Sequence, residues 1–487
     1  MDEFNPDFSR MPGKRRLCRS ECLLFPTLEH IVWAWSRNLN PHPAIGPSAT
    51  HARCKALKCL LALCVLYMGA LQTFAATTIA TNSGTWNDPS IWNNGIPAAG
   101  DDAVVAGGVT VLISNSTPWL AGFTNNGSLV FTNWDACLAA ANIVIASGVV
   151  THARCLSTNQ TPSVSNRVYF VCSNFTLMAT AAINADEKGY TPGGPGTPPS
   201  GSRAGGSYGG IGGRGGSGAY DTPSTPFQPG SAGQGQSSPY TGTGHGGGCV
   251  RIEASGHVTI DGVISANGRN PNGGDQGGGS GGGIYIRCDT FAGSGVVRAN
   301  GASVQHDGAE GINAPGAGGG GRIAVIYNPT NQRSLQARSS VSFSTRNGLP
   351  TQTYLPNAGT LGTLHFTDDQ IMPASMDTSF NGVIFGFSRW EASNVFANGA
   401  ILQFGADDFD LAVSNNFIFR LPQNYAYRPP LNPSRLTAGG DVIIGEANVV
   451  LSNNSPELVC GGNLALESNT TLSVWSSPTN GAPADYG

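Results

Sequence analysis

The sequence predicts an all-β protein, a right-handed parallel β-helix or β-solenoid with a long glycine-rich loop excursion. Three glycine runs recur, each followed by an alternating strand pattern: GGGCVRI from Gly246, GGGIYIR from Gly281 and GGGRIAV from Gly319. The related motifs GVISANG and GVVRANG lie between them. Short alternating segments at a nearly fixed spacing are typical of proteins that stack similar units, each burying its apolar face against the next.

The composition supports a folded chain with few charges. Of the 487 residues, 40% are hydrophobic and 11% are charged, and 43 of the 133 residues from Gly189 to Gly321 are glycine. The glycines have no strict three-residue period, which excludes collagen, and the interleaved valines and isoleucines argue against disorder. After residue 76 the chain has 17 basic and 25 acidic residues, a net charge of −8. This acidic balance excludes nucleic acid as an expected partner.

Residues 53–76 have the pattern of a secretory signal peptide. Arg53, Lys55 and Lys58 precede an apolar run that ends in small residues. A transmembrane anchor is the alternative, but the uninterrupted apolar run is shorter than the roughly 20 residues a span needs. Residues 1–52 form a non-structural extension, which indicates either a start assigned too far upstream or a long pre-region. We therefore expect a secreted or cell-surface protein without a membrane span in its mature part.

The remaining chain divides into four regions: an N-terminal β-solenoid segment at 77–185, a glycine-rich loop at 186–248, glycine-rich β repeats at 249–327 and a C-terminal β-solenoid at 328–487. The segment FTLMATAAIN from Phe175 aligns with HVTIDGVISANG from His257. The glycine-rich loop therefore interrupts one repeat array and does not link unrelated domains.

The C-terminal region repeats with a step of 22 residues. Its corresponding positions are Leu436 and Leu458, Asp441 and Asn463, Val442 and Leu464, and Ile444 and Leu466. Two strand segments and a turn in this length match one coil of a parallel β-helix, with stacked flat sandwiches as the alternative. The pattern runs on without a polar cap, which indicates either that further sequence follows or that the final residues serve as a cap.

Six cysteines follow the signal peptide: Cys137, Cys155, Cys172, Cys249, Cys288 and Cys460. Secretion permits disulfides, and six cysteines allow 15 pairings. Three of them, Cys249, Cys288 and Cys460, lie inside apolar strand patterns, where a cysteine also serves as a small buried hydrophobic residue. The sequence assigns no bridge.

Asp408 and Asp410 in FGADDFDLAV are the candidate metal ligands. On a strand both would project from the same face, about 7 Å apart. Two such carboxylates can hold Ca²⁺, or can act as acid and base on either side of a glycosidic bond. The alternative is a solvated strand face or an Asp-rich turn. No other cofactor is expected.

Four aromatic residues are candidates for ligand binding by stacking on sugar rings: Trp86, Trp92, Tyr190 and Tyr208. The alternative is that they pin long loops to the solenoid wall. The catalytic look-alikes in the glycine-rich sequence, such as GTGHGG from Gly242 and the glycine-flanked Ser207 and Ser280, have no following helix pattern. Phosphate binding and esterase chemistry both need that helix, so no catalytic residue is predicted.

From about Asn184 to Tyr327, the order of glycine excursion and GGG-initiated repeats resembles large secreted bacterial glycine-rich surface proteins of the adhesin and autotransporter-passenger type. The opening segment GTWNDPSIWNNGIPAAGDD is similar to the G8-type module of some extracellular β-helix proteins. The first resemblance implies a surface or matrix role. The second adds a possible action on polysaccharides, because some proteins with this module act on them.

Two functions follow as expectations. The first is a structural or adhesive β-solenoid without catalysis, in contact with extracellular polysaccharide or other cell-surface and matrix components. The second is a polysaccharide-binding or polysaccharide-cleaving β-helix protein, with Ca²⁺ as an optional ion. The second requires a groove in which Asp408, Asp410 and Arg389 or Arg420 converge.

Overall fold

The computed structural model describes ten segments, which are 76–155, 166–192, 194–235, 244–272, 276–305, 314–335, 338–350, 357–422, 427–452 and 455–475. All of them belong to one compact unit, Phe74–Gly487. The predicted extension and, apart from Ala76, the predicted signal peptide lie outside the described residues.

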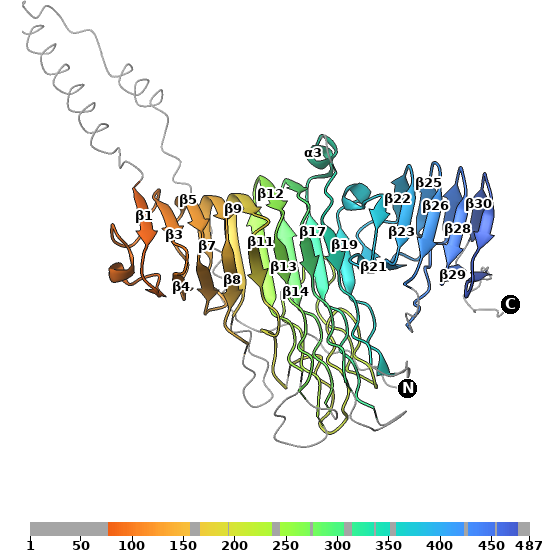
Figure 1. Ribbon diagram of the computed structural model, residues 1–487, viewed down its shortest axis with the longest axis horizontal. Helices are drawn as coiled ribbons and strands as arrows, with labels where there is room; N and C mark the ends of the chain where they lie inside the picture. The colour runs from red at the N-terminus through yellow and green to blue at the C-terminus, as the bar shows by residue number, and fades with distance from the viewer. Residues whose placement is uncertain are drawn as a thin grey trace, which may run out of the picture. The chain divides into compact units, whose positions relative to one another are not determined.

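Three parallel ladders form the wall of the N-terminal and middle coils (Figure 1). The first contains β1 (Thr77–Ala80), β3 (Asp102–Val105), β5 (Leu120–Asn125), β7 (Leu138–Ile145), β9 (Val168–Leu177), β12 (His257–Ile260) and β15 (Thr290–Ala292). The second contains β2 (Gly84–Thr85), β4 (Thr110–Ile113), β6 (Ser128–Phe131), β8 (Gly148–His152), β10 (Ala181–Asn184), β13 (Val263–Ser265), β16 (Val296–Arg298) and β18 (Ser342–Ser344). The third continues from β7 and β9 through β11 (Cys249–Ala254), β14 (Gly283–Arg287), β17 (Arg322–Ile326), β19 (Thr363–Phe366), β21 (Asn381–Phe385) and β24 (Ile401–Phe404).

The C-terminal coils continue as shorter parallel ladders. One contains β20 (Ser375–Met376), β23 (Val395–Asn398), β26 (Phe417–Arg420), β28 (Val442–Gly445) and β31 (Leu464–Leu466). A second contains β22 (Arg389–Ala392), β25 (Asp410–Val413), β27 (Arg435–Ala438) and β30 (Glu457–Cys460), and a third pairs β29 (Asn448–Leu451) with β32 (Thr471–Val474). The sequence correspondences are observed as strand pairs: Leu436 opposite Leu458, Val442 opposite Leu464 and Ile444 opposite Leu466.

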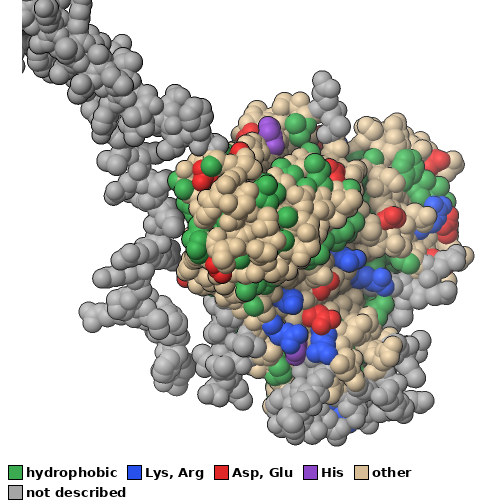
Figure 2. Space-filling view, turned by 60° about the vertical axis from the view of Figure 1, so that its left-hand side comes forward, with side chains coloured by type: hydrophobic (Ala, Val, Ile, Leu, Met, Phe, Trp, Pro, Cys, Tyr) green, Lys and Arg blue, Asp and Glu red, His purple; other side chains and the backbone are tan. Residues whose placement is uncertain are grey.

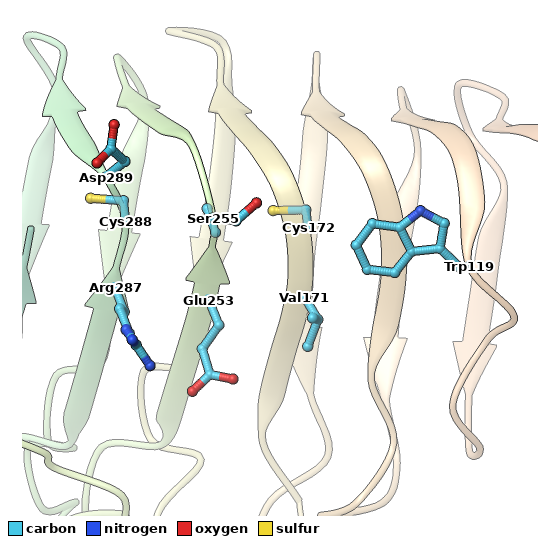
Figure 3. A pocket seen from close by; sticks show the side chains of 9 residues that line it. Trp119, Val171, Cys172, Glu253, Ser255, Arg287, Cys288 and Asp289 are labelled. Atoms are coloured by element: carbon cyan, nitrogen blue, oxygen red, sulfur yellow. The ribbon is translucent and has the colours of Figure 1, made fainter. Parts of the chain in front are cut away.

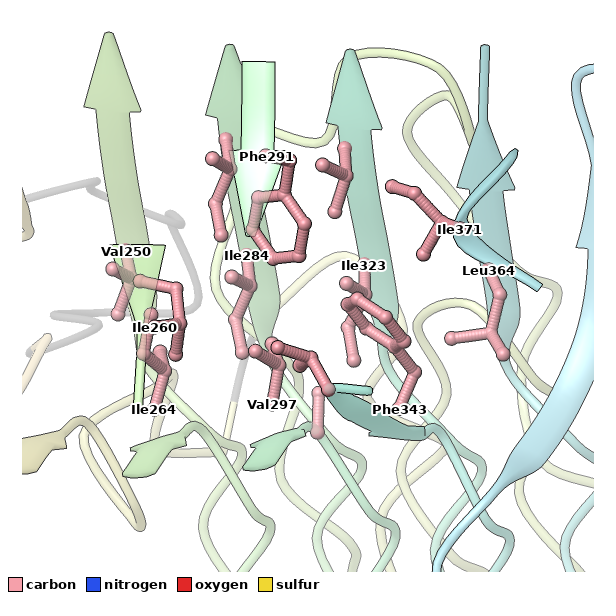
Figure 4. Packing of buried hydrophobic residues seen from close by; sticks show 14 of the residues in the cluster. Val250, Ile260, Ile264, Ile284, Phe291, Val297, Ile323, Phe343, Leu364 and Ile371 are labelled. Atoms are coloured by element: carbon pink, nitrogen blue, oxygen red, sulfur yellow. The ribbon is translucent and has the colours of Figure 1, made fainter. Parts of the chain in front are cut away.

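The core lies inside the coils because side chains alternate along each strand. Val250, Ile284, Ile323 and Leu364 occupy one inward position on four successive coils, and all are fully buried. Figure 4 shows these residues stacked along the solenoid with Phe291 and Phe343 between them. Each coil therefore buries its apolar residues against the next, and the predicted parallel β-solenoid is confirmed. The right-handedness of the coils stays a prediction.

The predicted glycine-rich loop has no regular strand in its described residues, 186–192, 194–235 and 244–248, but their backbone is extensively hydrogen-bonded. Gly206 N donates to Gly278 O at 2.9 Å, Gly319 N to Gly206 O at 3.0 Å, and Gly281 N to Gly319 O at 3.0 Å. The excursion therefore packs against the glycine turns of later coils, below β8 to β19 in Figure 1. We call this assembly the glycine lattice, and its described residues are 189–192, 194–235, 244–248, 266–269, 277–282, 299–303, 314–321, 345–348 and 357–362.

Glycine is required in the lattice because neighbouring backbones approach too closely for a side chain. A Cβ atom on Gly279 would lie 1.8 Å from the carbonyl oxygen of His245, and one on Gly281 would lie 2.0 Å from that of Ala299. Both distances are shorter than any real Cβ contact. The close backbone contacts show that this glycine-rich sequence forms an ordered lattice. Glycine content alone does not show this, because flexible linkers are also glycine-rich.

Within the ten described segments, short helices occur at three places: η1 (Pro89–Ile91), α3 (Pro329–Arg333) and η4 (Asp369–Ile371). The helix α3 begins with an Asn328 cap whose side chain accepts hydrogen bonds from the amides of Thr330 and Asn331. None of the helices in the described segments has the length and apolar character that crossing a bilayer requires.

Candidate functional site

The predicted carboxylates lie at the surface of the C-terminal coils. Asp410 begins β25, and Asp408 lies in the exposed turn before it. Both line a groove of about 410 Å³ together with Arg389 and Arg435. The convergence of Asp408, Asp410 and Arg389 that the enzyme hypothesis requires is therefore present. Arg420 lies elsewhere and forms an ion pair with Glu467 at 2.6 Å.

Ion pairs neutralise the better buried of the two carboxylates. The Asp410 carboxylate accepts a hydrogen bond from Arg389 at 2.8 Å and lies 3.8 Å from Arg435, while Arg435 also pairs with Glu457 at 3.0 Å. Ca²⁺ prefers six to eight oxygen ligands. Two guanidinium groups beside Asp410 do not offer that ligand set, and the described residues contain no cluster of three His, Cys, Asp or Glu side chains suited to a metal. The geometry therefore gives no support to the predicted calcium site.

Trp86 and Trp92 lie in the core at the first coil. They are 3% and 5% exposed, and their rings meet edge to face at 4.9 Å between centroids. The indole N–H of Trp92 donates to the carbonyl oxygen of Trp86 at 2.8 Å. A sugar ring cannot stack on either residue in this structure, and their position matches the alternative interpretation, a structural role.

Tyr190 and Tyr208 are buried in the glycine lattice. The Tyr208 hydroxyl donates to Asp221 at 2.7 Å, and its ring packs against Tyr220 with 4.8 Å between centroids. Burial raises the pKa of Tyr208 well above its usual value, so its phenol stays protonated. These tyrosines hold the excursion against the wall, which is again the structural alternative that the sequence left open.

Cys172, Cys249, Cys288 and Cys460 form no disulfide. Cys172, Cys249 and Cys288 are buried, and burial raises the pKa of Cys172 and of Cys249 to about 12. These thiols therefore stay protonated and act as small hydrophobic residues.

A second groove, which the sequence interpretation missed, crosses five successive coils of the N-terminal half. It encloses about 560 Å³ and is lined by Trp119, Val171, Cys172, Glu253, Ala254, Ser255, Arg287, Cys288 and Asp289. We call it the Trp119 groove. Figure 3 shows Trp119 at one end and Arg287 with Asp289 at the other, with Val171 and Glu253 between them.

Strand register sets the floor of the Trp119 groove. Ala139, Val171, Glu253 and Arg287 occupy one outward position on consecutive coils. Trp119 precedes β5, whose Leu120 pairs with Ala140. Trp119 therefore lies at the next step of the same column, and the four steps of about 4.8 Å extend over about 19 Å.

An arginine–tyrosine ladder borders this column. Arg251 lies between Tyr169 and Tyr285 on the neighbouring coils, with its guanidinium carbon 4.5 Å from the Tyr285 ring centroid and 5.8 Å from that of Tyr169. Arg251 also donates to Glu253, whose second oxygen accepts from the Tyr169 hydroxyl at 2.8 Å. Burial and the hydrogen bond to Glu253 raise the pKa of Tyr169 to about 12, so its phenol stays neutral. The charges of Arg251 and Glu253 neutralise each other.

Trp119 and Arg287 are the residues of the Trp119 groove whose side chains remain open to a ligand. Trp119 is 48% exposed, and Arg287 is exposed with no hydrogen-bond or ion-pair partner among the described residues. The Asp289 carboxylate, by contrast, accepts two hydrogen bonds from the Asn331 amide at 2.8 and 3.0 Å. In Figure 2 most Lys and Arg side chains gather in the middle and lower part of the face, whereas Asp and Glu side chains are scattered over it. The alternation of β11 and β14 indicates that Glu253 and Arg287 face outward, but only the register places them in the same column as Trp119.

The fold and these two surface grooves define a parallel β-solenoid with a hydrogen-bonded glycine lattice. No family model, curated protein or solved structure matches the chain in the comparisons with known proteins.

Proposed function

We propose that this chain is a secreted or cell-surface β-solenoid with a structural or adhesive role and no catalytic activity. The observation that carries the proposal is the continuous wall of parallel strands, stiffened along one side by the glycine lattice. Such a wall holds outward side chains at fixed spacing across many coils, which suits attachment to an extended surface. Its expected partners are extracellular polysaccharides or other matrix components.

The surroundings of the candidate carboxylates, Asp408 and Asp410, support a role without catalysis. An inverting or retaining glycosidase needs one carboxyl group that keeps its proton and one that stays free to act as base or nucleophile. Asp410 is held by Arg389, whose guanidinium donates to one of its carboxylate oxygens, so this carboxylate is not free to act as base or nucleophile. Asp408, in its exposed turn, lacks the apolar surroundings that keep a catalytic acid protonated.

The test is to incubate the full-length protein with neutral and acidic polysaccharides, with and without Ca²⁺. Co-sedimentation measures binding, and an assay for reducing and unsaturated ends measures cleavage in the same samples. The proposal expects binding to at least one polysaccharide without new chain ends. Absence of binding to every polysaccharide and to intact cell surfaces would overturn the adhesive role.

One observation favours the second candidate, a polysaccharide-cleaving protein: Asp408, Asp410 and Arg389 line the same groove. New chain ends that disappear with Asp408→Asn would establish this function in place of the first. Asp135→Asn is the matched control, because Asp135 is also an exposed aspartate but does not line this groove.

A further inference from the structure

We propose that the Trp119 groove binds a linear acidic polysaccharide, one whose sugars carry carboxylates, through stacking on Trp119 and ion pairing with Arg287. This inference rests on the proposed adhesive function and names its ligand class and its site. Its evidence is the column of outward residues from Trp119 to Arg287, none of which the sequence interpretation had selected.

Trp119 supplies the stacking surface. Large aromatic side chains stabilise a fold chiefly by burial, and an indole that is 48% exposed contributes little of that stabilisation. Trp119 differs in this from Trp86 and Trp92, whose rings are covered. The apolar C–H face of a sugar ring is a suitable partner for such an open indole, since contact removes apolar surface of both from water.

Arg287 selects an acidic ligand. Glu253 is paired with Arg251 and also accepts a hydrogen bond from the Tyr169 hydroxyl. The Asp289 carboxylate keeps its charge, but it accepts hydrogen bonds from Asn331 and points away from Arg287 in Figure 3. The exposed guanidinium of Arg287 is therefore the positive charge in the described lining that has no ion-pair partner. Guanidinium groups bind carboxylates through paired hydrogen bonds, which favours uronic-acid sugars over neutral ones.

The shape of the groove favours an extended chain. The floor between Trp119 and Glu253 consists of the small side chains of Ala139 and Val171, so a ligand can lie along the column without a barrier. The separation of about 19 Å between its ends corresponds to a short oligosaccharide. A peptide strand would require free backbone donors and acceptors, but β9 and β11 are paired on both sides in the sheet.

The test measures binding of the full-length protein to polygalacturonate and alginate, with dextran as the neutral comparison, by affinity electrophoresis. Trp119→Ala and Arg287→Gln should each weaken binding to the acidic polymers about tenfold, and added salt should weaken it further. The matched controls are Phe396→Ala and Arg298→Gln, which change an exposed aromatic residue and an exposed arginine outside the groove and should leave binding unchanged.

The outcomes separate this inference from the adhesive function on which it rests. If the protein binds the acidic polymers equally well with Trp119→Ala and Arg287→Gln, the groove is not the site, although adhesion stands. If it binds only dextran, the acidic ligand class is wrong. If it binds no polysaccharide and no cell surface, the adhesive function fails as well. Circular dichroism of both variants confirms that a loss of binding is not a loss of fold.

Discussion

The imidazole of His152 accepts a hydrogen bond at Nε2 from the backbone amide of Cys249, at 3.1 Å and across 97 residues of sequence. Its Nδ1 lies 2.8 Å from the carbonyl oxygen of Ala153 and donates to it. The side chain is fully buried, at the point where the glycine excursion returns to the wall. A neutral imidazole in this one tautomer satisfies both backbone groups, whereas a protonated ring would turn a second N–H toward the Cys249 amide.

The protein is therefore expected to lose stability as the pH falls. Burial lowers the pKa of His152 to about 4, whereas in the unfolded chain it is about 6.5. Between these values the unfolded state binds the proton first, so the free energy of unfolding decreases by about 3 kcal/mol in total for this residue. Urea unfolding at a series of pH values between 7.5 and 4 measures the decrease.

His152→Gln should flatten part of this pH dependence. A remainder is expected because burial also lowers the pKa of His245 to about 4. His257→Gln, which replaces an exposed histidine in the same way, is the matched substitution for comparison. An unchanged pH profile in His152→Gln would contradict the assignment of this loss of stability to His152.

The glycine lattice predicts a sharp difference between two alanine substitutions. Gly281→Ala should lower the free energy of unfolding by about 1–3 kcal/mol or more, because the new Cβ would lie 2.0 Å from the Ala299 carbonyl oxygen. Gly218→Ala in the same glycine-rich excursion should change it by less than about 0.5 kcal/mol, because nothing lies within 4 Å of that Cβ. Thermal and urea unfolding compare the two, and equal effects would show that the lattice is not formed.

The buried tryptophans are expected to serve stability and not ligand binding. Trp92→Ala should lower the free energy of unfolding by about 3–5 kcal/mol, since it removes a core ring and its bond to the Trp86 carbonyl. The exposed Trp119 is the comparison, and Trp119→Ala should cost far less stability. Urea unfolding followed by tryptophan fluorescence measures both. A stability loss for Trp119→Ala as large as that for Trp92→Ala would contradict this division of roles.

Thiol reactivity offers a further check. Iodoacetamide should leave Cys249 unmodified in the native protein at pH 8, because the residue is buried and burial raises the pKa of its thiol to about 12. Cys460, which is partly exposed, should react before Cys249. Mass spectrometry of digests after timed alkylation distinguishes them, and rapid native modification of Cys249 would show that the base of the excursion opens.

The sequence was sufficient to predict the stacked coils, because short-range alternation and repeat spacing determine which residues face inward. The pairing of Ile264 with Val297 follows from the two GVxxANG motifs, and that of Leu436 with Leu458 follows from the 22-residue step. Phe175 pairs with Val258, one residue from the His257 position that the alignment suggested. Such a shift matters because it exchanges inward and outward side chains.

The binding surfaces could not be predicted in the same way. Trp119 and Arg287 are 168 residues apart, and the coils between them vary in length because the glycine excursion interrupts them. Their alignment depends on four successive strand registers, and no single segment carries that information. The exposure of Tyr208 was also misjudged, because its polar glycine-rich surroundings resemble an open loop until the backbone bonds of the lattice are known.

The central claim is that this chain is a rigid scaffold, with its glycine-rich part hydrogen-bonded into the wall. Amide hydrogen exchange of the full-length protein, read by mass spectrometry, tests it most directly. The account predicts that the amides of Gly206, Gly281 and Gly319 exchange as slowly as those of β11 and β14, because each donates to a backbone carbonyl. Exchange of these glycine amides at the rate of an unstructured chain would contradict the lattice and the rigid scaffold with it.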